Sequence, residues 1–319
     1  MEELVEDFLE YLEIEKGCSP GTIREYRHYL TRFSNWLRET APQARPEDLD
    51  LELVRKYRLY LAHLEGRNGA SLKRATQVYH IVALRAFLRY LVVRRDLATL
   101  SPDKVELPKM GSRLVKFLDG EQVERLLATP DVSTPAGLRD RAIMETLFST
   151  GLRVSELVKL NRDEISLERQ EFGVVGKGGK PRVVFLSTEA TEWLRSYLAS
   201  RRDGFRPLFI RYAGSTDFAR DGEKMRLSAR SVERIVEKYA RRCGLPIKAS
   251  PHTLRHSFAT DLLRGGADLR SVQEMLGHES IRTTQVYTHV TDRLLREVHR
   301  AFHSRTRPTA PDSPPPTAP

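Results

Sequence analysis

The sequence predicts a mainly α-helical protein of two domains that contains one small antiparallel β-sheet. Apolar residues recur at helical spacing of three and four through most of the chain. Three short β-type runs lie close together between residues 164 and 186. The 319 residues also exceed the size of one ordinary domain, about 150 residues. Together these observations predict an α+β protein in which the sheet belongs to the second domain.

Residues 1–95 are predicted to form a domain of helices only. Ser19 and Pro20 supply an N-cap and a first-turn proline, which are typical helix-start residues. A helical apolar face follows them, made of Ile23, Tyr26, Leu30, Phe33 and Leu37. A break at 69–71 precedes a long last helix that ends near residue 95.

That last helix is predicted to contact nucleic acid. Residues 16–100 contain 16 basic and 8 acidic side chains, and almost no acids interleave with the bases of the helix. The candidate DNA-binding side chains are Lys73, Arg74, Arg85 and Arg89. We interpret them as a surface that faces phosphates, and the simpler alternative is a solvated helix face.

Residues 96–113 lose the helical periodicity and contain two prolines and a glycine, so we expect a linker. The second domain is expected over 114–304, with helices at about 120–128 and 137–148 and strands at 164–167, 171–175 and 182–186. The glycine-rich segment 176–181 joins the last two strands as a hairpin. Further helices are expected after residue 187 and at about 228–243, 251–264, 268–276, 281–288 and 291–303.

Two segments carry no core signal. Residues 212–227 look like a polar excursion, and its function is not predicted. Residues 305–319 contain six prolines and almost no apolar side chains, which predicts a disordered tail.

The composition favours a polyanionic partner and excludes several protein classes. The net charge is +10, and 41 of the 53 basic residues are arginines, whose planar fork fits phosphate. The two cysteines are far apart, which argues against a disulfide scaffold or a cysteine-ligated zinc site and suits a reducing compartment. No apolar run reaches the roughly 20 residues of a membrane span. The acidic start is unlike a signal peptide, so we expect a cytoplasmic protein.

Residues 250–256 are predicted to start a helix that binds an anion. His252 and Arg255 are three residues apart, so they share a face in the first turn, where free N–H groups and the helix dipole favour phosphate. His252 and His256 also have the spacing of a zinc-binding pair. Thr253 stands where a zinc protease has glutamate, and no nearby carboxylate completes a ligand set, so we expect no metal.

Four other residues have ordinary structural explanations when each is taken alone. Arg153 would be a helix-start arginine paired with Glu156, and Lys177 a solvated turn lysine. His278 would interact with a helix C-terminus, and Tyr287 would be a core tyrosine. Their occurrence together, in a fixed order, is less easily explained by structure alone.

The segments TGLRVSEL, GKGGKPR, PHTLRHSFAT and LGHESIRTTQVYTHV occur in this order between residues 150 and 290. They resemble the catalytic motifs of the tyrosine recombinases, the phage-integrase family, and most closely the Xer-type site-specific recombinases. The resemblance covers about 118–303. The N-terminal domain, with SPGTIREYRHYL, resembles the SAM-like core-binding domain of the same family, so a core-binding domain followed by a catalytic domain is the implied architecture.

The resemblance implies a catalytic set of Arg153, Lys177, His252, Arg255, His278 and Tyr287. Tyr287 would be the nucleophile that leaves a 3′-phosphotyrosyl linkage, and the two arginines would bind the nonbridging oxygens. His252 would act as the base, Lys177 as the acid for the 5′-oxygen, and His278 as a donor to the phosphate. The linkage stores the bond energy, so no ATP is expected. No acidic cluster that could hold two divalent ions is evident, so the arginines would replace metal ions, and no cofactor is expected.

The resemblance also implies partners and a cellular role. Double-stranded DNA with a specific recombination site is the expected substrate, bound by a homo-tetramer or by a hetero-tetramer with a related recombinase. The expected reaction passes through a Holliday junction, with chromosome or plasmid dimer resolution as the role and an activating DNA translocase as a further partner. Helix 291–303 would dock on a neighbouring subunit, although packing on its own domain is the simpler alternative. The alternatives in function are a mobile-element integrase, a type IB topoisomerase-like enzyme and an inactive DNA clamp.

Overall fold

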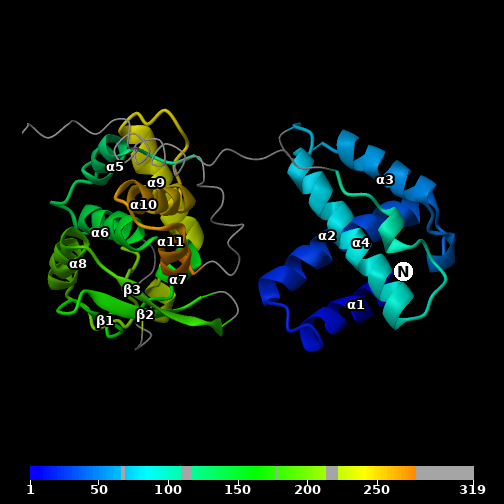
Figure 1. Ribbon diagram of the computed structural model, residues 1–319, viewed down its shortest axis with the longest axis horizontal. Helices are drawn as coiled ribbons and strands as arrows, with labels where there is room; N and C mark the ends of the chain where they lie inside the picture. The colour runs from blue at the N-terminus through cyan, green and yellow to red at the C-terminus, as the bar shows by residue number, and fades with distance from the viewer. Residues whose placement is uncertain (66–68, 109–115, 177–178, 213–221, 278–319) are drawn as a thin grey trace, which may run out of the picture. The chain divides into compact units, whose positions relative to one another are not determined.

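The computed structural model describes residues 1–65, 69–108, 116–176, 179–212 and 222–277 (Figure 1). The chain divides into two compact units, with the division between residues 112 and 113. The first is helical, and the second contains helices and one three-stranded antiparallel sheet. The predicted fold class is therefore confirmed. In the described ranges, no helix is both long and apolar enough to cross a membrane.

The first unit is built on helices that pack around one aromatic-rich core. Its elements are α1 (Glu2–Ile14), α2 (Pro20–Thr40), η1 (Pro46–Asp48), α3 (Leu51–His63), α4 (Arg74–Arg94) and η2 (Pro102–Lys104). The Ser19 hydroxyl accepts a hydrogen bond from the Thr22 N–H at 3.3 Å, as the N-cap prediction requires. Helices α1, α2 and α4 contact one another, and Phe8, Phe33 and Phe87 lie fully buried between them.

The first half of the segment expected as a linker packs on this unit. Val105 is 0% exposed, and Leu97 and Leu100 lie against the same core. Helix η2 contacts α4, and the Leu97 N–H bonds to the Leu91 carbonyl at 3.0 Å. The apolar residues between the prolines explain this packing, because burying them stabilises the unit by the hydrophobic effect.

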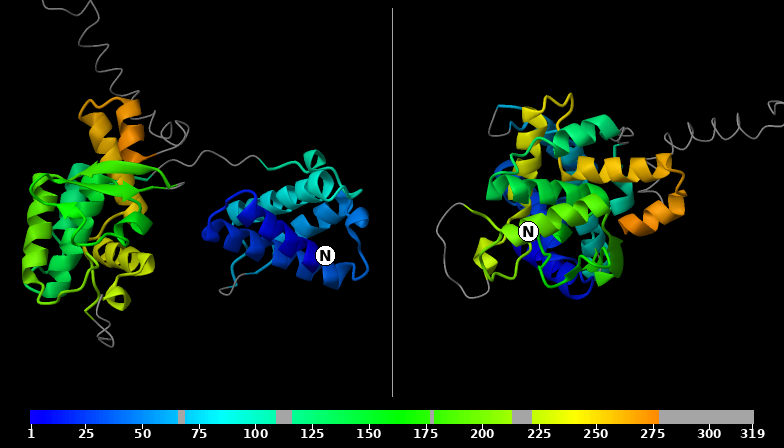
Figure 2. Two further views of the ribbon diagram at one scale, coloured as in Figure 1. Left: turned by 90° about the horizontal axis from the view of Figure 1, so that it is seen from below. Right: turned by 90° about the vertical axis from the view of Figure 1, so that its left-hand side faces the viewer.

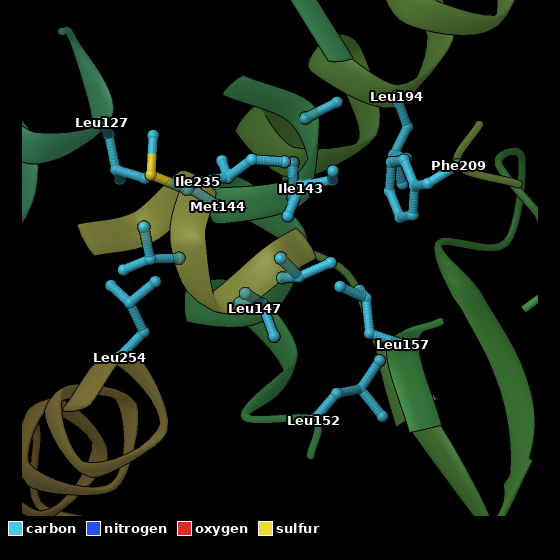
Figure 3. Close-up of a cluster of buried hydrophobic side chains, with 14 of the residues drawn as sticks. Leu127, Ile143, Met144, Leu147, Leu152, Leu157, Leu194, Phe209, Ile235 and Leu254 are labelled. Atoms are coloured by element: carbon cyan, nitrogen blue, oxygen red, sulfur yellow. The ribbon is translucent and has the colours of Figure 1, made fainter. Parts of the chain in front are cut away.

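The second unit is organised around helix α6. Its helices are α5 (Gly120–Leu127), α6 (Pro135–Thr150), α7 (Val154–Leu157), α8 (Thr188–Ser200), η4 (Glu223–Met225), α9 (Ala229–Arg242), α10 (Pro251–Arg264) and α11 (Leu269–Leu276). Helix α6 contacts α5, α8, α9, α10 and the sheet. Its side chains Ile143, Met144 and Leu147 lie at the centre of the core, between residues of α5, α9 and α10 (Figure 3). A helix that is surrounded in this way is buried on most of its faces.

The sheet has the strand order β1 (Ile165–Ser166), β2 (Glu171–Val175), β3 (Pro181–Phe185). Val174 pairs with Arg182, and the Gly176 N–H bonds to the Lys180 carbonyl at 2.9 Å, which closes the predicted hairpin. Strand β3 contacts α11, and α11 contacts α10, so the hairpin and the gold and orange helices lie close together (Figure 2).

The end of the polar excursion belongs to the core, contrary to the prediction for 212–227. Met225 and Leu227 are 4% and 6% exposed. The Leu227 N–H bonds to the Phe209 carbonyl, and the Arg211 N–H bonds to the Met225 carbonyl, so this short segment runs antiparallel to its neighbour. The pattern was too short to predict this, since only two apolar residues mark it.

Candidate active site

Arg255 lies on α10 and connects the ends of two other helices. Its side chain is buried, with the residue only 4% exposed. One terminal nitrogen donates to the Gly151 carbonyl at the end of α6, and the other donates to the Leu276 carbonyl at the end of α11, at 2.7 Å. Carbonyls of a last helical turn lack helical partners and carry the negative end of the dipole. They therefore hold a buried guanidinium well.

Arg153 also binds the end of α11, from a different part of the sequence. It is the N-cap of α7 and follows the end of α6 by three residues. Its guanidinium donates to the Gly277 carbonyl at 3.1 Å. The two arginines thus bind adjacent carbonyls, those of Leu276 and Gly277, although they are about a hundred residues apart in the sequence.

Two glycines in the left-handed region make this arrangement possible. Gly151 has φ +60° and ends α6, and Gly277 has φ +62° and ends α11. Non-glycine residues rarely adopt this conformation. A Cβ at Gly151 would also lie 2.4 Å from the Phe258 ring. Each glycine turns a carbonyl toward an arginine and lets the chain pack closely there.

Glu156 anchors Arg153 from the protein side. The carboxylate accepts bonds from the Arg153 N–H at 2.9 Å and from the Arg153 guanidinium at 2.9 Å. It also accepts two bonds from Arg182 of β3, at 3.1 and 2.8 Å. Burial alone would raise the pKa of this carboxyl, but the bonds to Arg182 and Arg153 lower the pKa to about 2. Glu156 is therefore ionised at neutral pH, and the pairing expected for Arg153 is confirmed.

His252 lies exposed in the first turn of α10, three residues before Arg255. The start of this helix is fixed by a capping box. The Thr253 N–H bonds to the Ser250 hydroxyl at 3.3 Å, and the Ser250 N–H bonds to the Thr253 hydroxyl at 3.1 Å. The exposed imidazole is thus presented to solvent by a fixed helix start.

His256 differs from His252 because it is partly buried. Burial lowers its pKa to about 4, and the neighbouring His252 and Arg255 add to the effect. At neutral pH this imidazole is uncharged. Within the described ranges, no group of three or more histidine, cysteine, aspartate and glutamate side chains could hold a metal ion.

In the first unit, the acids of α1 neutralise a particular set of bases. Carboxylates of α1 and of its C-cap Glu15 pair with arginines of α2, of α4 and of the α4 C-cap, in the pairs Glu6–Arg27, Glu2–Arg38, Glu15–Arg94 and Asp7–Arg95. Arg94 and Arg95 come from the end of the helix that the sequence predicts to face phosphates, and both are paired with acids here.

The predicted DNA-binding residues fall into two groups. Lys73 and Arg74 are exposed at the start of α4, and neither forms an ion pair with another residue of the described ranges. Arg85 and Arg89 share Asp103 of η2, at 3.3 and 3.4 Å. The sequence did not indicate this acidic partner, because it comes from outside the helix. Exposed pairs of this length contribute little stability, so they do not prevent the arginines from binding elsewhere.

The comparisons with known proteins agree with this architecture. Residues 116–293 match the phage integrase family model, and residues 5–95 match the model of the phage integrase N-terminal SAM-like domain. The chain belongs to the phage integrase family. It is a tyrosine recombinase, and the resemblance stated from the sequence motifs is confirmed.

Curated relatives match the recombinase over nearly its whole length. It is 39% identical over 307 residues to tyrosine recombinase XerC of Pelotomaculum thermopropionicum, which covers 95% of this chain and 98% of the relative. It is also 39% identical over 306 residues to tyrosine recombinase XerD of Listeria innocua, which covers 96% and 100%. These relatives establish the recombinase as an enzyme of site-specific DNA recombination.

Solved structures show the same fold at lower identity. The Tn1549 transposon integrase in complex with transposon right end DNA has a TM-score of 0.70 at 18% identity, covering 94% of this chain and 99% of that one. The XerH site-specific recombinase bound to a palindromic difH substrate has a TM-score of 0.67 at 24% identity, covering 89% and 80%.

The structure of the recombinase brings together the part of the predicted catalytic set that it describes. Arg153 and Arg255 meet at the end of α11, and His252 lies one helical turn before Arg255. Lys177, His278 and Tyr287 lie outside the described residues. Their chain neighbours are described: Gly176 lies beside Arg182, and Gly277 accepts the bond from Arg153.

One participant in the site was not assigned from the sequence. Arg182 stands in the quoted motif GKGGKPR but received no role, because a basic residue after a turn is usually solvated. One feature of the sequence could have indicated its role. In the predicted hairpin Arg182 pairs with Val174, which is buried, so both side chains lie on the face of the sheet that packs on the core.

Proposed function

We propose that this recombinase cuts DNA by attack of Tyr287 on a phosphate held between Arg153 and Arg255. The observation that carries this proposal is the convergence of both guanidiniums on the adjacent carbonyls of Leu276 and Gly277. Each arginine has five N–H donors. Arg153 uses two of its side-chain N–H bonds within the described part of the molecule, so donors remain for a phosphate.

Arginines at this place supply the charge that the transition state needs. Attack on a phosphodiester increases the negative charge on the nonbridging oxygens. Both guanidiniums are already held by protein carbonyls, and Arg153 also by a carboxylate, so they need little reorganisation when the transition state forms. They also stay charged at any working pH. Fixed donors of this kind contribute about 3 kcal/mol each to a transition state.

The remaining roles follow from the chemistry of each residue type. A tyrosine has an ordinary pKa near 10, so Tyr287 must lose its proton on attack. His252, exposed on the first turn of α10, is the proposed base. Lys177 is the proposed acid for the departing 5′-oxygen, and His278 the proposed donor to the phosphate. The 3′-phosphotyrosyl linkage preserves the bond energy, so strand rejoining needs no ATP.

A nicked suicide substrate tests this proposal. The short 5′-hydroxyl fragment diffuses away after cleavage, so an active enzyme accumulates as a covalent DNA complex. Tyr287→Phe should bind the same DNA and form no complex. Full trapping by the Phe variant would show that another residue attacks. Trapping at the wild-type rate in excess chelator supports the metal-free mechanism, and loss of trapping there would contradict it.

We propose a cellular Xer-type role, resolution of chromosome or plasmid dimers in the cytoplasm at the nucleoid. The full-length similarity to relatives named XerC and XerD supports this role over that of a mobile-element integrase. The target would be a specific duplex site, bound with a second copy or a related recombinase and activated by a DNA translocase. Immunoprecipitation of DNA from cells tests it: enrichment at one chromosomal site agrees, and enrichment at element ends supports the integrase instead.

A type IB topoisomerase-like activity shares the cleavage chemistry and needs its own comparison. Relaxation of a supercoiled plasmid that lacks a recombination site requires cleavage without exchange. Recombination between two sites, with a Holliday junction intermediate, requires ordered exchange. We expect the second activity to dominate.

We propose residues 1–95 as the core-binding domain and 114–304 as the catalytic domain. In the first unit, the pairs formed by the acids of α1 leave Lys73 and Arg74 without a charged partner among the described residues. These two residues are the strongest candidates for phosphate contacts, and Arg85 and Arg89 are further candidates that Asp103 restrains.

Tetramer assembly is proposed to use helix 291–303 of a neighbouring copy. A groove of about 840 Å³ lies between α5, α6, α8, α10 and α11, and its lining includes the apolar Phe148, Trp193, Leu262 and Met275. Acidic residues of the lining are Glu124, Glu145, Glu189 and Asp261. As a helix, segment 291–303 would carry an apolar stripe of Leu294, Leu295, Val298 and Phe302, and the segment also contains three arginines. The polarity and charge of the groove therefore complement those of segment 291–303.

Sedimentation of the recombinase on a two-site DNA tests this assembly. Phe302→Glu and Leu262→Glu should each abolish the tetramer and leave single-site binding unchanged. If the helix packs on its own domain instead, these variants should lower the melting temperature and leave assembly of the folded fraction intact.

A further inference from the structure

Arg182 lies where three segments of the proposed active site meet. It is a residue of β3, opposite Val174 of β2, and its side chain is only 11% exposed. Its guanidinium reaches the Glu156 carboxylate on α7. Its stem packs against Gly277 at the end of α11, and one terminal nitrogen lies near Gly176 at the end of β2.

The carboxylate of Glu156 is divided equally between two arginines. Oε1 accepts from the Arg153 and Arg182 side chains at 2.9 and 3.1 Å. Oε2 accepts from the Arg153 backbone N–H and the Arg182 side chain at 2.9 and 2.8 Å. With both oxygens occupied in this way, Glu156 can bind only one terminal nitrogen of the Arg153 fork. The other terminal nitrogen reaches the Gly277 carbonyl.

Removing Arg182 would change this division. A carboxylate that loses a bidentate partner turns toward the remaining cation, since a buried negative charge needs compensation. The remaining cation is Arg153, and the favoured geometry of a lone arginine–carboxylate pair is the parallel two-bond fork. Arg153 would then rotate toward Glu156, away from Gly277 and from the place where a phosphate binds.

The contacts of Arg182 also depend on two residues that lack a Cβ. A Cβ at Gly277 would lie 3.1 Å from the Arg182 Cδ, and one at Gly176 would lie 3.2 Å from an Arg182 terminal nitrogen. The Arg182 Nε is buried and has no hydrogen-bond partner in the described part of the chain. A buried donor without a partner is destabilising, so the position of Arg182 costs some stability.

We propose that Arg182 is a positioning residue for Arg153, which it keeps oriented toward the scissile phosphate by holding the shared Glu156 carboxylate in place. This inference rests on the proposed role of Arg153 in binding that phosphate. Both terminal nitrogens of Arg182 donate to the Glu156 carboxylate, which fits a role in positioning.

The cleavage rate of Arg182→Gln on the nicked substrate tests the inference. A misplacement of about 1 Å at a reacting group can cost about 100-fold in rate. We therefore expect Arg182→Gln to slow covalent trapping about 100-fold at saturating enzyme, with DNA affinity unchanged. Arg169→Gln is the matched control, because it removes an equal charge from an exposed position of the same sheet region and should cleave at the wild-type rate.

A double-mutant cycle with Arg153→Lys separates positioning from a general structural effect. If Arg182 acts through Arg153, adding Arg182→Gln to Arg153→Lys should slow cleavage less than about threefold further. A further loss of about 100-fold would overturn the inference. If Arg153→Lys itself cleaves at the wild-type rate, the proposed role of Arg153 fails instead, so the two failures are distinguishable.

A substrate with sulfur in place of the bridging 5′-oxygen excludes an effect through Lys177. A thiolate leaves without an acid, so a defect in the proposed acid disappears on this substrate. The defect of Arg182→Gln should persist on this substrate. Its disappearance would show that Arg182 acts through Lys177 instead of Arg153.

If the Gln variant melts at a lower temperature, Arg182→Lys is used in the same double-mutant cycle. Its single point charge cannot bridge both carboxylate oxygens.

Discussion

Glu156→Gln is predicted to destabilise the catalytic unit by removing the shared negative charge between Arg153 and Arg182. The carboxyl has a pKa of about 2 in the folded protein instead of 4.5, and its side chain is 6% exposed. That difference corresponds to about 3 to 4 kcal/mol of stability at neutral pH. Because the folded pKa is lowered, the contribution is fully present above pH 4.5 and is lost as the pH falls from 4.5 toward 2.

Urea unfolding at pH 7 and pH 3 measures this prediction. The chain contains two tryptophans, Trp36 in the first unit and Trp193 in the second, so a Trp36→Phe background makes fluorescence report on the catalytic unit alone. The difference between wild type and Glu156→Gln should be about 3 to 4 kcal/mol at pH 7 and about 1 to 2 kcal/mol at pH 3. Glu168→Gln, at an exposed position, is the control and should change little. A difference below about 0.5 kcal/mol at pH 7, or one independent of pH, would refute the reasoning.

Three further predictions concern other parts of the molecule. Gly151→Ala should lower stability by about 3 kcal/mol in the same unfolding assay, because it combines a left-handed φ of +60° with a Cβ 2.4 Å from a phenylalanine ring, and a loss under about 1 kcal/mol would contradict this. The catalytic unit should lose stability as the pH falls from 6.5 through about 4, since the folded pKa of His256 is lowered and the unfolded chain binds the proton more readily; His256→Asn should reduce that loss, and an unchanged pH profile would contradict it. Replacing Lys73 and Arg74 by alanine should reduce the slope of log K against log salt by about 2, whereas Arg38→Ala, at a base already paired with an acid, should not change it.

The local features of the fold were predictable from the sequence. Helix starts carry their own signals, as Ser19 and Ser250 show by accepting the N–H bonds expected of an N-cap. The hairpin was also local, because two β-type runs flank a glycine-rich turn whose residues Gly176 and Lys180 bond to each other. Such features depend on residues only a few positions apart, so one sequence contains the information.

The missed features depend on contacts between distant segments. Arg182 and Glu156 are 26 residues apart, and nothing in the local sequence of either residue indicates that they meet. Val105 lies among prolines and charges, and only the neighbouring α4 shows why it is fully buried. Met225 and Leu227 flank a single bridge between Ile210 and Arg226, which is too short for periodicity to indicate.

The site itself was predicted by motif order, and the structure supplies what motif order lacks. Composition could not separate the proposed catalytic arginines from the other basic residues, because all 41 arginines contribute equally to the net charge. The structure distinguishes Arg255 by burial and by its two carbonyl partners, and Arg153 by its fixed bonds to Glu156 and Gly277. A preorganised cation differs from a solvated one in these contacts.

The central claim is that Tyr287 attacks DNA. Its most direct measurement is the mass of the covalent adduct on the trypsin fragment 283–293, in which Tyr287 is the sole tyrosine. After trapping on a nicked substrate and digestion with nuclease and trypsin, this fragment should carry a 3′-linked nucleotide phosphate on Tyr287. An adduct on any other residue, or an unmodified fragment in a preparation that has cleaved its DNA, would contradict the account.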